Sequence, residues 1–502
     1  MSITSVIRPL FNPRLRELDL YSTQAERLQT DVMLRLTSRA AQTEWGRAHG
    51  FAGVRTYEDF AATSPINSYD DLKGYVERMV HGESDVLWRG RVTHFAKSSG
   101  TTSDRSKFLP VSKDALRDTH YRGGQDCVAC YLRQNPGSRI LDGRALILGG
   151  SRSAADSTKE SMVGDLSAIL IENISPLVNL IRVPRKSTAL LPDFEEKRDR
   201  IAREAIGKNV SNLSGVPSWM LSVMNRVLEI SGKDNLTEVW PNLEMFFHGG
   251  VAFTPYRELY HRLIPSDNMH YMETYNASEG FFGVQTDAGD PAMSLMIDYG
   301  VFYEFIPLDE LDRDNPQVLP LWAVETGRNY AMVISTSSGM WRYLIGDTVR
   351  FTSCNPYKFV ITGRTKSFIN AFGEEVIVDN AEKALHEACL KTGAEVLEYT
   401  AAPIYMDASG HCRHQWVVEF TKEPADEAQF AQILDEALQR INSDYEAKRY
   451  KNITLQPLQL VKARKGLFHD WLDSKGRLGG QHKVPRLSNS RQHIEELLAL
   501  NA

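Results

Sequence analysis

The sequence has little cysteine and no strong excess of charge of either sign. Five cysteines in 502 residues are too few, and odd in number, for a disulfide framework, so we expect reduced thiols. Lysine and arginine total 58 against 64 aspartate and glutamate residues, giving a net charge of −6. Proteins dedicated to nucleic acids usually carry a basic excess. We therefore expect no nucleic-acid partner.

Long apolar runs are also missing. The most apolar stretch, SAILIENISPLVNLI, contains Glu172, Asn173 and Pro176, so it cannot span a bilayer. Arg8 and Pro9 interrupt the N-terminal segment before the apolar region of a signal peptide could form. We expect a soluble, cytoplasmic protein that binds no membrane and exists as a monomer or weak dimer.

The remaining composition is ordinary. Hydrophobic residues make up 42% and charged residues 24%, close to the average of globular proteins. The length suggests two to four folding units and suffices for a large core without disulfide or metal staples. Cys127 and Cys130 form a lone C-x-x-C in a predicted helix, where the spacing places both thiols on one face. Ordinary packing is the favoured interpretation over a metal or redox site.

From about residue 88 onward, short apolar runs alternate with loops rich in glycine and serine. The segments are VTHFAK before SSGTTS, RALILGGSRS and LEMFFHGGVAF. This rhythm of strand, loop and helix is typical of an α/β domain, whose ligands gather at the carboxyl ends of strands. Apolar spacing predicts helices within 15–48, 195–208 and 216–231, and β-rich sections over 293–306 and 329–351.

The pattern changes again near residues 363–375. A predicted helix then ends at Gly393, and QWVVEF and LQPLQLVKA are predicted strands. Between them, ADEAQFAQILDEALQRINSDYEAKR is predicted to form one amphipathic helix. We therefore predict an α/β protein with a large domain over 1–369 and a smaller α+β domain over 370–502.

Two segments have the composition of a nucleotide site. The run from Ser98 to Lys107, SSGTTSDRSK, offers backbone N–H groups, hydroxyls and a cation to phosphates. It is not a Walker A loop, because no second glycine directly precedes the lysine, and a surface turn is the alternative. In YMETYNASEGFFG, the carboxylate of Glu279 is a reasonable Mg²⁺ ligand, with a solvated glutamate as the alternative. Ser278 is not a hydrolase nucleophile, since the first glycine of G-x-S-x-G is missing.

Two further segments carry one candidate each. In GMWRYLIGD, Asp347 follows a glycine at a predicted strand and could accept hydrogen bonds from a ribose diol, although such a pair is also a common turn. In GQHKVPR, Lys483 lies in a glycine-rich stretch near the C-terminus, where an exposed tail lysine is the simpler interpretation.

In this order, the four segments resemble the Gretchen Hagen acyl-acid amido synthetases, which belong to the adenylate-forming superfamily. Trp240-Pro241-Asn242 and His248-Gly249-Gly250 add to the resemblance, which runs from about residue 90 to 490. It implies a large multi-sheet α/β N-terminal domain that binds ATP and the acyl group, and a mobile C-terminal cap that carries a catalytic lysine.

The resemblance also implies a role for each matching residue. Lys483 would neutralise charge on the α-phosphate, and Glu279 would bind Mg²⁺. Tyr275 would stack on adenine, and Asp347 would bind the ribose. The full set implied for ATP and AMP is Ser98, Ser99, Gly100, Thr101, Thr102, Lys107, Gly249, Gly250, Tyr275, Asn276, Ala277, Ser278, Asp347 and Arg364. The implied acyl pocket is Val216, Trp219, Met220, His248 and Phe253, although core packing explains these residues equally well.

The implied reaction joins a small carboxylic acid to an amine, most simply an amino acid, through an acyl-adenylate. Three alternatives stay open: a thioester-forming synthetase that uses CoA or a carrier protein, a non-catalytic nucleotide-binding relative, and a kinase that would release ADP. Two departures from the family pattern stand out, Ser103-Asp104 after the hydroxyl run and His482 in place of a tyrosine. Because of these two departures, we do not assume that this chain acts on the same substrates as the plant members.

Overall fold

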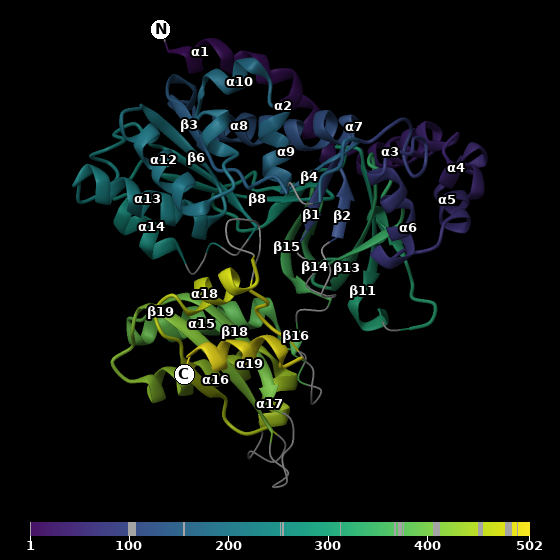
Figure 1. Ribbon diagram of the computed structural model, residues 1–502. Coiled ribbons are helices and arrows are strands. Elements are labelled where there is room, and N and C mark those ends of the chain that lie inside the picture. The colour runs from purple at the N-terminus through teal and green to yellow at the C-terminus, as the bar shows by residue number, and fades with distance from the viewer. Residues whose placement is uncertain are drawn as a thin grey trace.

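The computed structural model is a mixed α/β fold in which a large N-terminal part carries the main sheet and a smaller C-terminal part lies against one edge of it (Figure 1). It describes residues 2–98, 107–153, 156–250, 253, 256–311, 313–365, 368–369, 374, 376–404, 412–449, 455–476, 484–488 and 490–501.

Short helices cover the N-terminal eighty residues. They are α1 (Ile3–Ile7), α2 (Asn12–Asp19), α3 (Ala25–Ala40), α4 (Glu44–Ala48), α5 (Tyr57–Thr63) and α6 (Tyr69–Val80). The predicted helical stretch 15–48 is therefore divided among three helices. The last division has a clear local cause, because Thr43 caps α4 by accepting a hydrogen bond from Gly46 N at 3.0 Å.

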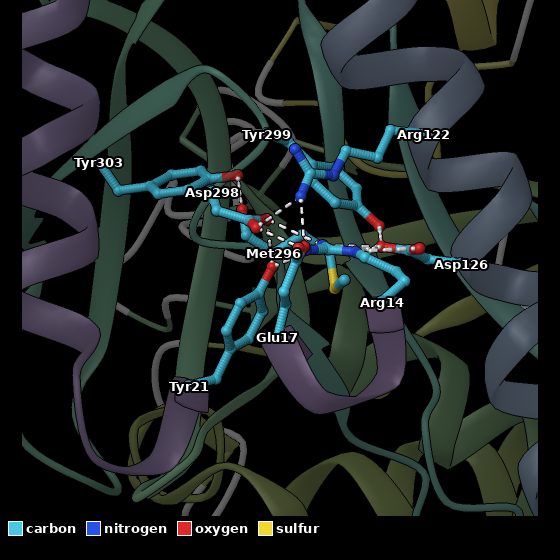
Figure 2. A network of polar contacts seen from close by, with 9 residues as sticks. All are labelled: Arg14, Glu17, Tyr21, Arg122, Asp126, Met296, Asp298, Tyr299 and Tyr303. Atoms are coloured by element: carbon cyan, nitrogen blue, oxygen red, sulfur yellow. Dashed lines mark hydrogen bonds and ion pairs between the residues drawn. The ribbon is translucent and has the colours of Figure 1, made fainter. Parts of the chain in front are cut away.

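A network of charged and phenolic side chains fastens α2 to the rest of the molecule (Figure 2). Arg14 of α2 lies between Asp126 and Asp298, at 2.8 Å and 2.6 Å from their carboxylate oxygens. Asp126 belongs to α8 (Arg122–Gln134) and also accepts a hydrogen bond from Tyr299 at 2.6 Å. One arginine therefore joins the N-terminal helix α2, helix α8 and the segment that leads into the strand Val301–Pro307.

The main sheet has twelve strands in the order β12-β11-β13-β14-β15-β10-β9-β8-β7-β6-β3-β5. In chain order they are β3 (Arg144–Ile147), β5 (Arg182–Val183), β6 (Val210–Gly215), β7 (Met245–Gly249), β8 (His270–Ala277), β9 (Gly280–Val284), β10 (Met293–Leu295), β11 (Val301–Pro307), β12 (Leu319–Pro320), β13 (Asn329–Thr336), β14 (Tyr343–Cys354) and β15 (Tyr357–Arg364).

Strand β8 divides this sheet into two halves. It pairs in parallel with β7, as do β7 with β6, β6 with β3 and β3 with β5. On its other side it pairs antiparallel with β9, and the remaining strands continue antiparallel. The carboxyl ends of β3, β6, β7 and β8 consequently lie along one edge, which is where open α/β sheets bind ligands.

Helices cover both faces of the parallel half. On one face, α12 (Phe194–Ile206), α13 (Pro217–Ser231) and α14 (Arg257–Leu263) share a core cluster with Leu213 and Phe246 of the strands. On the other face lie α8 and α9 (Leu166–Glu172). Cys127 and Cys130 are buried on α8 as free thiols, which confirms the prediction of ordinary packing.

Shorter elements complete the N-terminal part. A separate sheet contains β1 (His94–Ser98), β2 (Lys107–Pro110) and β4 (Met162–Gly164) in the order β2-β1-β4. Three short helices, α7 (Lys113–Ala115), α10 (Pro176–Leu180) and α11 (Lys186–Ala189), connect the larger elements.

The C-terminal part contains its own sheet of β18 (Glu395–Ile404), β19 (Arg413–Lys422) and β20 (Gln459–Lys462). The short strands β16 (Phe368–Ile369) and β17 (Val376–Ile377) pair beside it. Five helices accompany these strands: α15 (Val378–Thr392), α16 (Glu427–Ile441), α17 (Ser443–Arg449), α18 (Leu467–Ser474) and α19 (Gln492–Asn501). As predicted, α15 ends at Gly393, whose φ is 67°.

The single amphipathic helix predicted after residue 424 is wrong. It divides at Asn442, which has extended backbone and accepts a hydrogen bond from Tyr445 N at 2.8 Å. Asparagine is a strong N-cap because its side chain satisfies an unpaired N–H of the first turn. The division into domains at residue 369 stays a prediction. Among the described residues, no helix has the length and apolar character needed to cross a membrane.

Candidate active site

A cavity of about 1690 Å³ opens where the carboxyl ends of the parallel strands face the C-terminal part. From the main sheet it is lined by Gly149 and Gly150 after β3, Gly215 of β6, Gly249 and Gly250 at the end of β7, and Ala277, Ser278 and Glu279 after β8. From the C-terminal part it is lined by Asp379, Glu382, Lys383, His386 and Glu398, and by Val484, Pro485 and Arg486. The cavity therefore collects most of the segments that the sequence singled out.

Gly249 is needed for the close approach of β7 and β8 at the cavity edge. A Cβ at this position would lie 2.2 Å from the Thr274 carbonyl oxygen, which is backbone and cannot move aside. The two strands are further joined by a hydrogen bond of 3.1 Å from Thr274 Oγ1 to the His248 carbonyl. A side chain at position 249 would push these strands apart.

Glu279 lies at the tip of a tight hairpin. Strands β8 and β9 pair up to Ala277 and Gly280, so the loop between them is only Ser278 and Glu279. Burial and the nearby charge of Asp347 raise the pKa of Glu279 to about 7, against the opposing charges of Arg364 and Lys107. Ser278 is itself buried and lines the cavity. The hairpin thus holds a desolvated carboxylate at a fixed place in the cavity wall.

Asp347 of β14 lies within a cluster of three polar side chains. Arg364 is its cross-strand neighbour on β15, with Nε at 2.8 Å from Asp347 Oδ1. Tyr275 Oη donates a hydrogen bond to the other carboxylate oxygen. The charge of Asp347 raises the pKa of Arg364, so this arginine stays cationic. The sequence predicted that Asp347, Arg364 and Tyr275 belong to one site, and the structure brings them together.

Lys107 begins β2 beside the same cluster. Its Nζ lies 3.4 Å from Tyr343 Oη and within 6 Å of the ring centres of Tyr69 and Tyr343. It does not line the cavity, although its charge lowers the pKa of Glu279. Ser98 ends strand β1, and Ser99, Gly100, Thr101 and Thr102 lie outside the described residues. Their phosphate role stays a prediction.

Lys483 also lies outside the described residues, but the chain directly after it is well anchored. Thr400 Oγ1 donates a hydrogen bond of 2.6 Å to the Pro485 carbonyl, and Ala401 N donates one of 2.9 Å to the Arg486 carbonyl. Residues 484–488 therefore run along β18 and carry Val484, Pro485 and Arg486 into the cavity wall.

Four of the five residues predicted for the acyl pocket line the cavity, namely Val216, Trp219, His248 and Phe253. Met220 does not. It is fully buried in the core cluster between α13 and the sheet. Successive helical residues project about 100° apart, so the first turn of α13 presents Trp219 to the cavity and Met220 to the core. For Met220 the core-packing alternative is the correct one.

The sequence interpretation missed a buried histidine in the cavity wall. His120 Nδ1 lies 2.9 Å from Asn276 Oδ1, and burial lowers the pKa of His120 to about 4, so the ring is neutral. It belongs to a π-helical turn over Leu116–Tyr121, a distortion that often marks functional sites. The neutral imidazole fixes the side chain of Asn276, which the sequence placed at the nucleotide.

A second missed residue is Glu273, three residues after the start of β8. Its side chain lines the cavity beside the acyl-pocket residues, and burial raises its pKa to about 7. Glu273 shares one face of β8 with Tyr271 and Tyr275, and this strand is mostly only partly buried, so the sequence carried no local signal that the glutamate lines a cavity.

Among the described residues, no group of three or more histidine, cysteine or acidic side chains could hold a metal ion. The donor chemistry nevertheless fits Mg²⁺. Glu279 and Asp347 are close enough for one carboxylate to raise the pKa of the other, which a divalent cation would relieve. Mg²⁺ is usually bound by one or two carboxylates together with substrate phosphates and water, not by a cage made entirely of protein.

Comparison with known proteins agrees with this arrangement. The GH3 family N-terminal domain matches residues 14–269, the central domain matches 294–364 and the C-terminal domain matches 379–492. The chain belongs to the GH3 family. The family prediction made from the four sequence segments is therefore confirmed.

Curated relatives of this GH3 chain include several synthetases. The indole-3-acetic acid-amido synthetase GH3.3 of Arabidopsis thaliana is 24% identical, covering 94% of this chain and 91% of its own length. The 4-substituted benzoates-glutamate ligase GH3.12 of Arabidopsis thaliana is 25% identical over 88% and 89%, respectively. The jasmonoyl–L-amino acid synthetase GH3.5 of Oryza sativa subsp. japonica is 25% identical over 97% and 96%.

Solved structures show the same fold. The AtGH3.15 acyl acid amido synthetase in complex with 2,4-DB superposes with a TM-score of 0.79 at 19% identity, covering 97% of this chain and 96% of that chain. A 2-hydroxyisobutyryl-CoA ligase in the postadenylation state gives a TM-score of 0.58 at 14% identity over 94% and 90%. The predicted fold class is confirmed.

Proposed function

We propose that this chain is an ATP-dependent acyl-acid amido synthetase that activates a small carboxylic acid as its adenylate and transfers the acyl group to an amine. One observation supports this most directly. A single cavity is lined by the hairpin carboxylate Glu279, by Asp347 with its partner Arg364, and by the chain that directly follows Lys483. The names of the family relatives, which are amido synthetases and an amino-acid ligase, agree with this activity.

The chemistry proceeds in two displacements. A carboxylate oxygen of the acid attacks the α-phosphorus of ATP, and pyrophosphate leaves. The amine then attacks the carbonyl carbon of the mixed anhydride, AMP leaves, and the ammonium proton passes to solvent or to a nearby base. Such displacements depend on positioning and on stabilising developing charge, so the protein's task is mainly to place charged groups.

The nucleotide end of the cavity has groups suited to this task. The Asp347 carboxylate, held by Arg364 and Tyr275, has free lone pairs that can accept hydrogen bonds from ribose hydroxyls. The backbone around Gly249 and Gly250 lies open to the cavity and could approach the nucleotide closely. Glu279 would hold Mg²⁺ together with phosphate oxygens, and the cation would supply neutralising charge.

Lys483 would supply charge to the α-phosphate and acyl oxygen once the C-terminal part, predicted as residues 370–502, closes on the site. The adjoining residues Val484–Arg486 already lie in the cavity wall, which supports this role. Replacing Lys483 with alanine should lower the rate of adenylate formation by about 10² or more, the usual cost of one stabilising contact. An unchanged rate of pyrophosphate exchange would remove Lys483 from the catalytic groups.

The decisive experiment is ATP–pyrophosphate exchange over a panel of aryl, indole and aliphatic acids. We expect exchange with at least one class, release of AMP and not ADP, and amide formation when an amino acid is added. Absence of exchange with every acid would contradict adenylation, and ADP release would indicate phosphoryl transfer. If preformed adenylate yielded a product with CoA but none with amino acids or hydroxylamine, the amide product would be wrong.

A further inference from the structure

The acyl end of the cavity contains an aromatic chamber with an acidic group in its wall. We define this chamber by Val216, Trp219, His248, Phe253, Tyr256 and Glu273, all of which line the cavity. The rings of His248 and Phe253 stack with centroids 4.2 Å apart. Aromatic and aliphatic walls of this kind suit a flat, largely apolar ligand.

Two polar groups of the chamber, the Nδ1 atom of His248 and the Glu273 carboxylate, have no hydrogen-bond partner among the residues that the structure describes. His248 is 3% exposed, and its Nδ1 atom makes no hydrogen bond. Among the residues that the structure describes, no side chain or backbone group forms a hydrogen bond or ion pair with the Glu273 carboxylate, which lies against the cavity. Buried polar atoms such as His248 Nδ1 are nearly always paired in folded proteins, and the half-buried Glu273 carboxylate beside it is open to the cavity, so the two groups together point to a ligand that pairs with them.

The strand register places these two groups side by side. His248 of β7 and Glu273 of β8 are direct partners in the parallel ladder, so their side chains leave the same face of the sheet. Tyr275 lies on that face two residues further along β8, roughly 6.6 Å away at the usual rise per residue. Its hydroxyl bonds to Asp347 at the nucleotide end. Glu273 thus lies two residues along the strand from the tyrosine that contacts Asp347.

An unpaired carboxylate is a costly choice for a wall residue. Desolvation raises the pKa of Glu273 to about 7, with only Arg257 opposing through its charge. Burying an uncompensated charge disfavours the folded state, and leucine or glutamine would line the chamber at lower cost. Because the residue stabilises nothing in the protein that the structure shows, its hydrogen-bonding capacity is available to substrate.

We propose that Glu273, with His248 beside it, selects a carboxylic acid whose ring carries a hydrogen-bond donor, a hydroxyl or amino group, at the end remote from the carboxylate. This inference rests on the proposed synthetase activity and specifies its substrate class. Sites built to bond a substrate hydroxyl or amine discriminate strongly against analogues that lack it, because the protein group is then left unpaired.

The test uses pyrophosphate exchange with matched pairs of acids. Benzoate, phenylacetate and 3-phenylpropanoate would each be supplied with a para hydroxyl, amino or methyl group. The three acids differ in the number of carbon atoms between the ring and the carboxylate. For the acid whose length fits the chamber best, kcat/KM of the form with a hydroxyl or amino group should exceed kcat/KM of the methyl form by roughly 30-fold or more, as expected for a hydrogen bond to a charged group. Glu273→Leu should reverse the preference, and Glu273→Gln should leave an intermediate one.

Glu229→Gln on the exposed face of α13 is the matched control and should keep the wild-type preference. The inference would be overturned if methyl and donor-bearing acids reacted within threefold of each other, or if Glu273→Leu kept the preference. A failure of all acids to support exchange is a different result, which contradicts the proposed function itself.

A stability measurement checks the unpaired state of Glu273 without any substrate. Its raised pKa means that Glu273 costs stability increasingly as pH rises through about 7. Glu273→Leu should therefore be at least as stable as wild type in urea, with a gain that is larger at pH 8 than at pH 6. A loss of stability at pH 8 would show that Glu273 has a structural partner and would contradict the inference.

Discussion

At the scale of single residues, Glu279 and Asp347 show how two neighbouring carboxylates can have different tasks. Asp347 is held by Arg364 and Tyr275, and its charge raises the pKa of Arg364. Glu279 is desolvated at the hairpin tip with a pKa of about 7. A protonated carboxyl is a poor ligand for a cation, and an ionised one is a good ligand. The efficiency with which ATP is used should therefore depend on pH through the ionisation of Glu279.

We expect kcat/KM for ATP with Mg²⁺ to rise as pH increases through about 7, because Glu279 becomes ionised. Asp347→Asn should shift this rise to lower pH, since the charge of Asp347 raises the pKa of Glu279. At pH 8 the same variant should lose roughly 10- to 100-fold in kcat/KM for ATP through a missing charged hydrogen bond. The measurement is the pH profile of pyrophosphate exchange.

Glu279→Gln serves as the control, because it should remove the rise altogether. An Asp347→Asn profile that coincided with the wild-type profile would show that the two carboxylates are not coupled.

The residues that could be predicted from the sequence share one property, and the missed ones share another. Asp347, Glu279 and Arg364 lie in contiguous motifs whose glycines mark turns and strand ends. His120 and Glu273 carry no such local mark, because their roles depend on burial and on neighbours brought together by the sheet, such as Asn276 and His248. Met220 fails for the opposite reason: it is next to a lining residue in sequence but faces the core.

At the scale of secondary-structure elements, two attachments matter most. The network of Figure 2 fastens α2 to α8 and to the segment before β11 through Arg14. The bonds from β18 to residues 485 and 486 fasten the segment that follows Lys483. Each is a small set of polar bonds that positions a whole element.

Arg14→Leu should lower the free energy of unfolding by about 3–5 kcal/mol at pH 7, because it leaves the buried Asp126 without its cation and Asp298 with Arg122 alone. Burial raises the pKa of Asp298, but the hydrogen bonds and charge of Arg14 outweigh this and hold it below its usual value. A carboxylate with a lowered pKa stabilises the fold above its unfolded pKa of about 3.9 and loses that effect at lower pH. The deficit of the variant should therefore shrink as pH falls below about 4.

Urea unfolding at pH 7 and at about pH 3 measures both effects, with the exposed neighbour Arg16→Leu as the matched control. Equal deficits at the two pH values would argue against the electrostatic origin.

Residues 484–488, which directly follow Lys483, are here called the lysine segment. Thr400→Val should weaken the attachment of this segment to β18 while preserving the shape of the side chain. The lost hydrogen bond to the Pro485 carbonyl is worth about 1 kcal/mol, so we expect the rate of adenylate formation to fall by about fivefold with an unchanged KM for ATP. Thr23→Val, at an exposed threonine of the N-terminal part that donates a hydrogen bond to the Leu20 carbonyl, is the control and should have no effect on the rate. If only the KM for ATP changed, the substitution would act on nucleotide binding and not on the position of the lysine segment, which would contradict this prediction.

Among the elements, those with strong periodicity and clear ends were predictable, including α13, β7 and the end of α15 at Gly393. The division between α16 and α17 was not recognised, because the apolar spacing continues across it and only the capping side chain of Asn442 reveals the break. The order of the twelve strands could not be predicted either, since their pairing joins segments far apart in the chain.

At the scale of the whole molecule, α14 of the large part meets β18 of the C-terminal part. Arg262 donates a hydrogen bond of 2.7 Å to Glu395, and in this ion pair the arginine is exposed to solvent and the glutamate is half-buried. In the orientation it supports, Val484–Arg486 line the cavity. The sequence predicted two unequal parts, of which the smaller carries the lysine motif, but not this contact, which depends on the orientation of the two parts.

Arg262→Glu should therefore lower the pyrophosphate exchange rate by up to about fivefold, because an exposed pair contributes at most about 1 kcal/mol. The swapped variant Arg262→Glu/Glu395→Arg should restore the rate, and added salt should reduce the difference between wild type and the single variant. A swapped variant as slow as the single variant would show that the pair does not act through its charge.

The position of β8 at the boundary between the parallel and antiparallel halves has a consequence for how such proteins diverge. Its hairpin presents Glu279, and its middle presents Glu273 at the acyl chamber. Because the turn is only two residues long, an insertion there would displace Glu279, whereas a substitution at position 273 leaves the turn intact. Under the proposed roles, a change of one inward-facing side chain would alter the accepted acid without disturbing the carboxylate placed for activation.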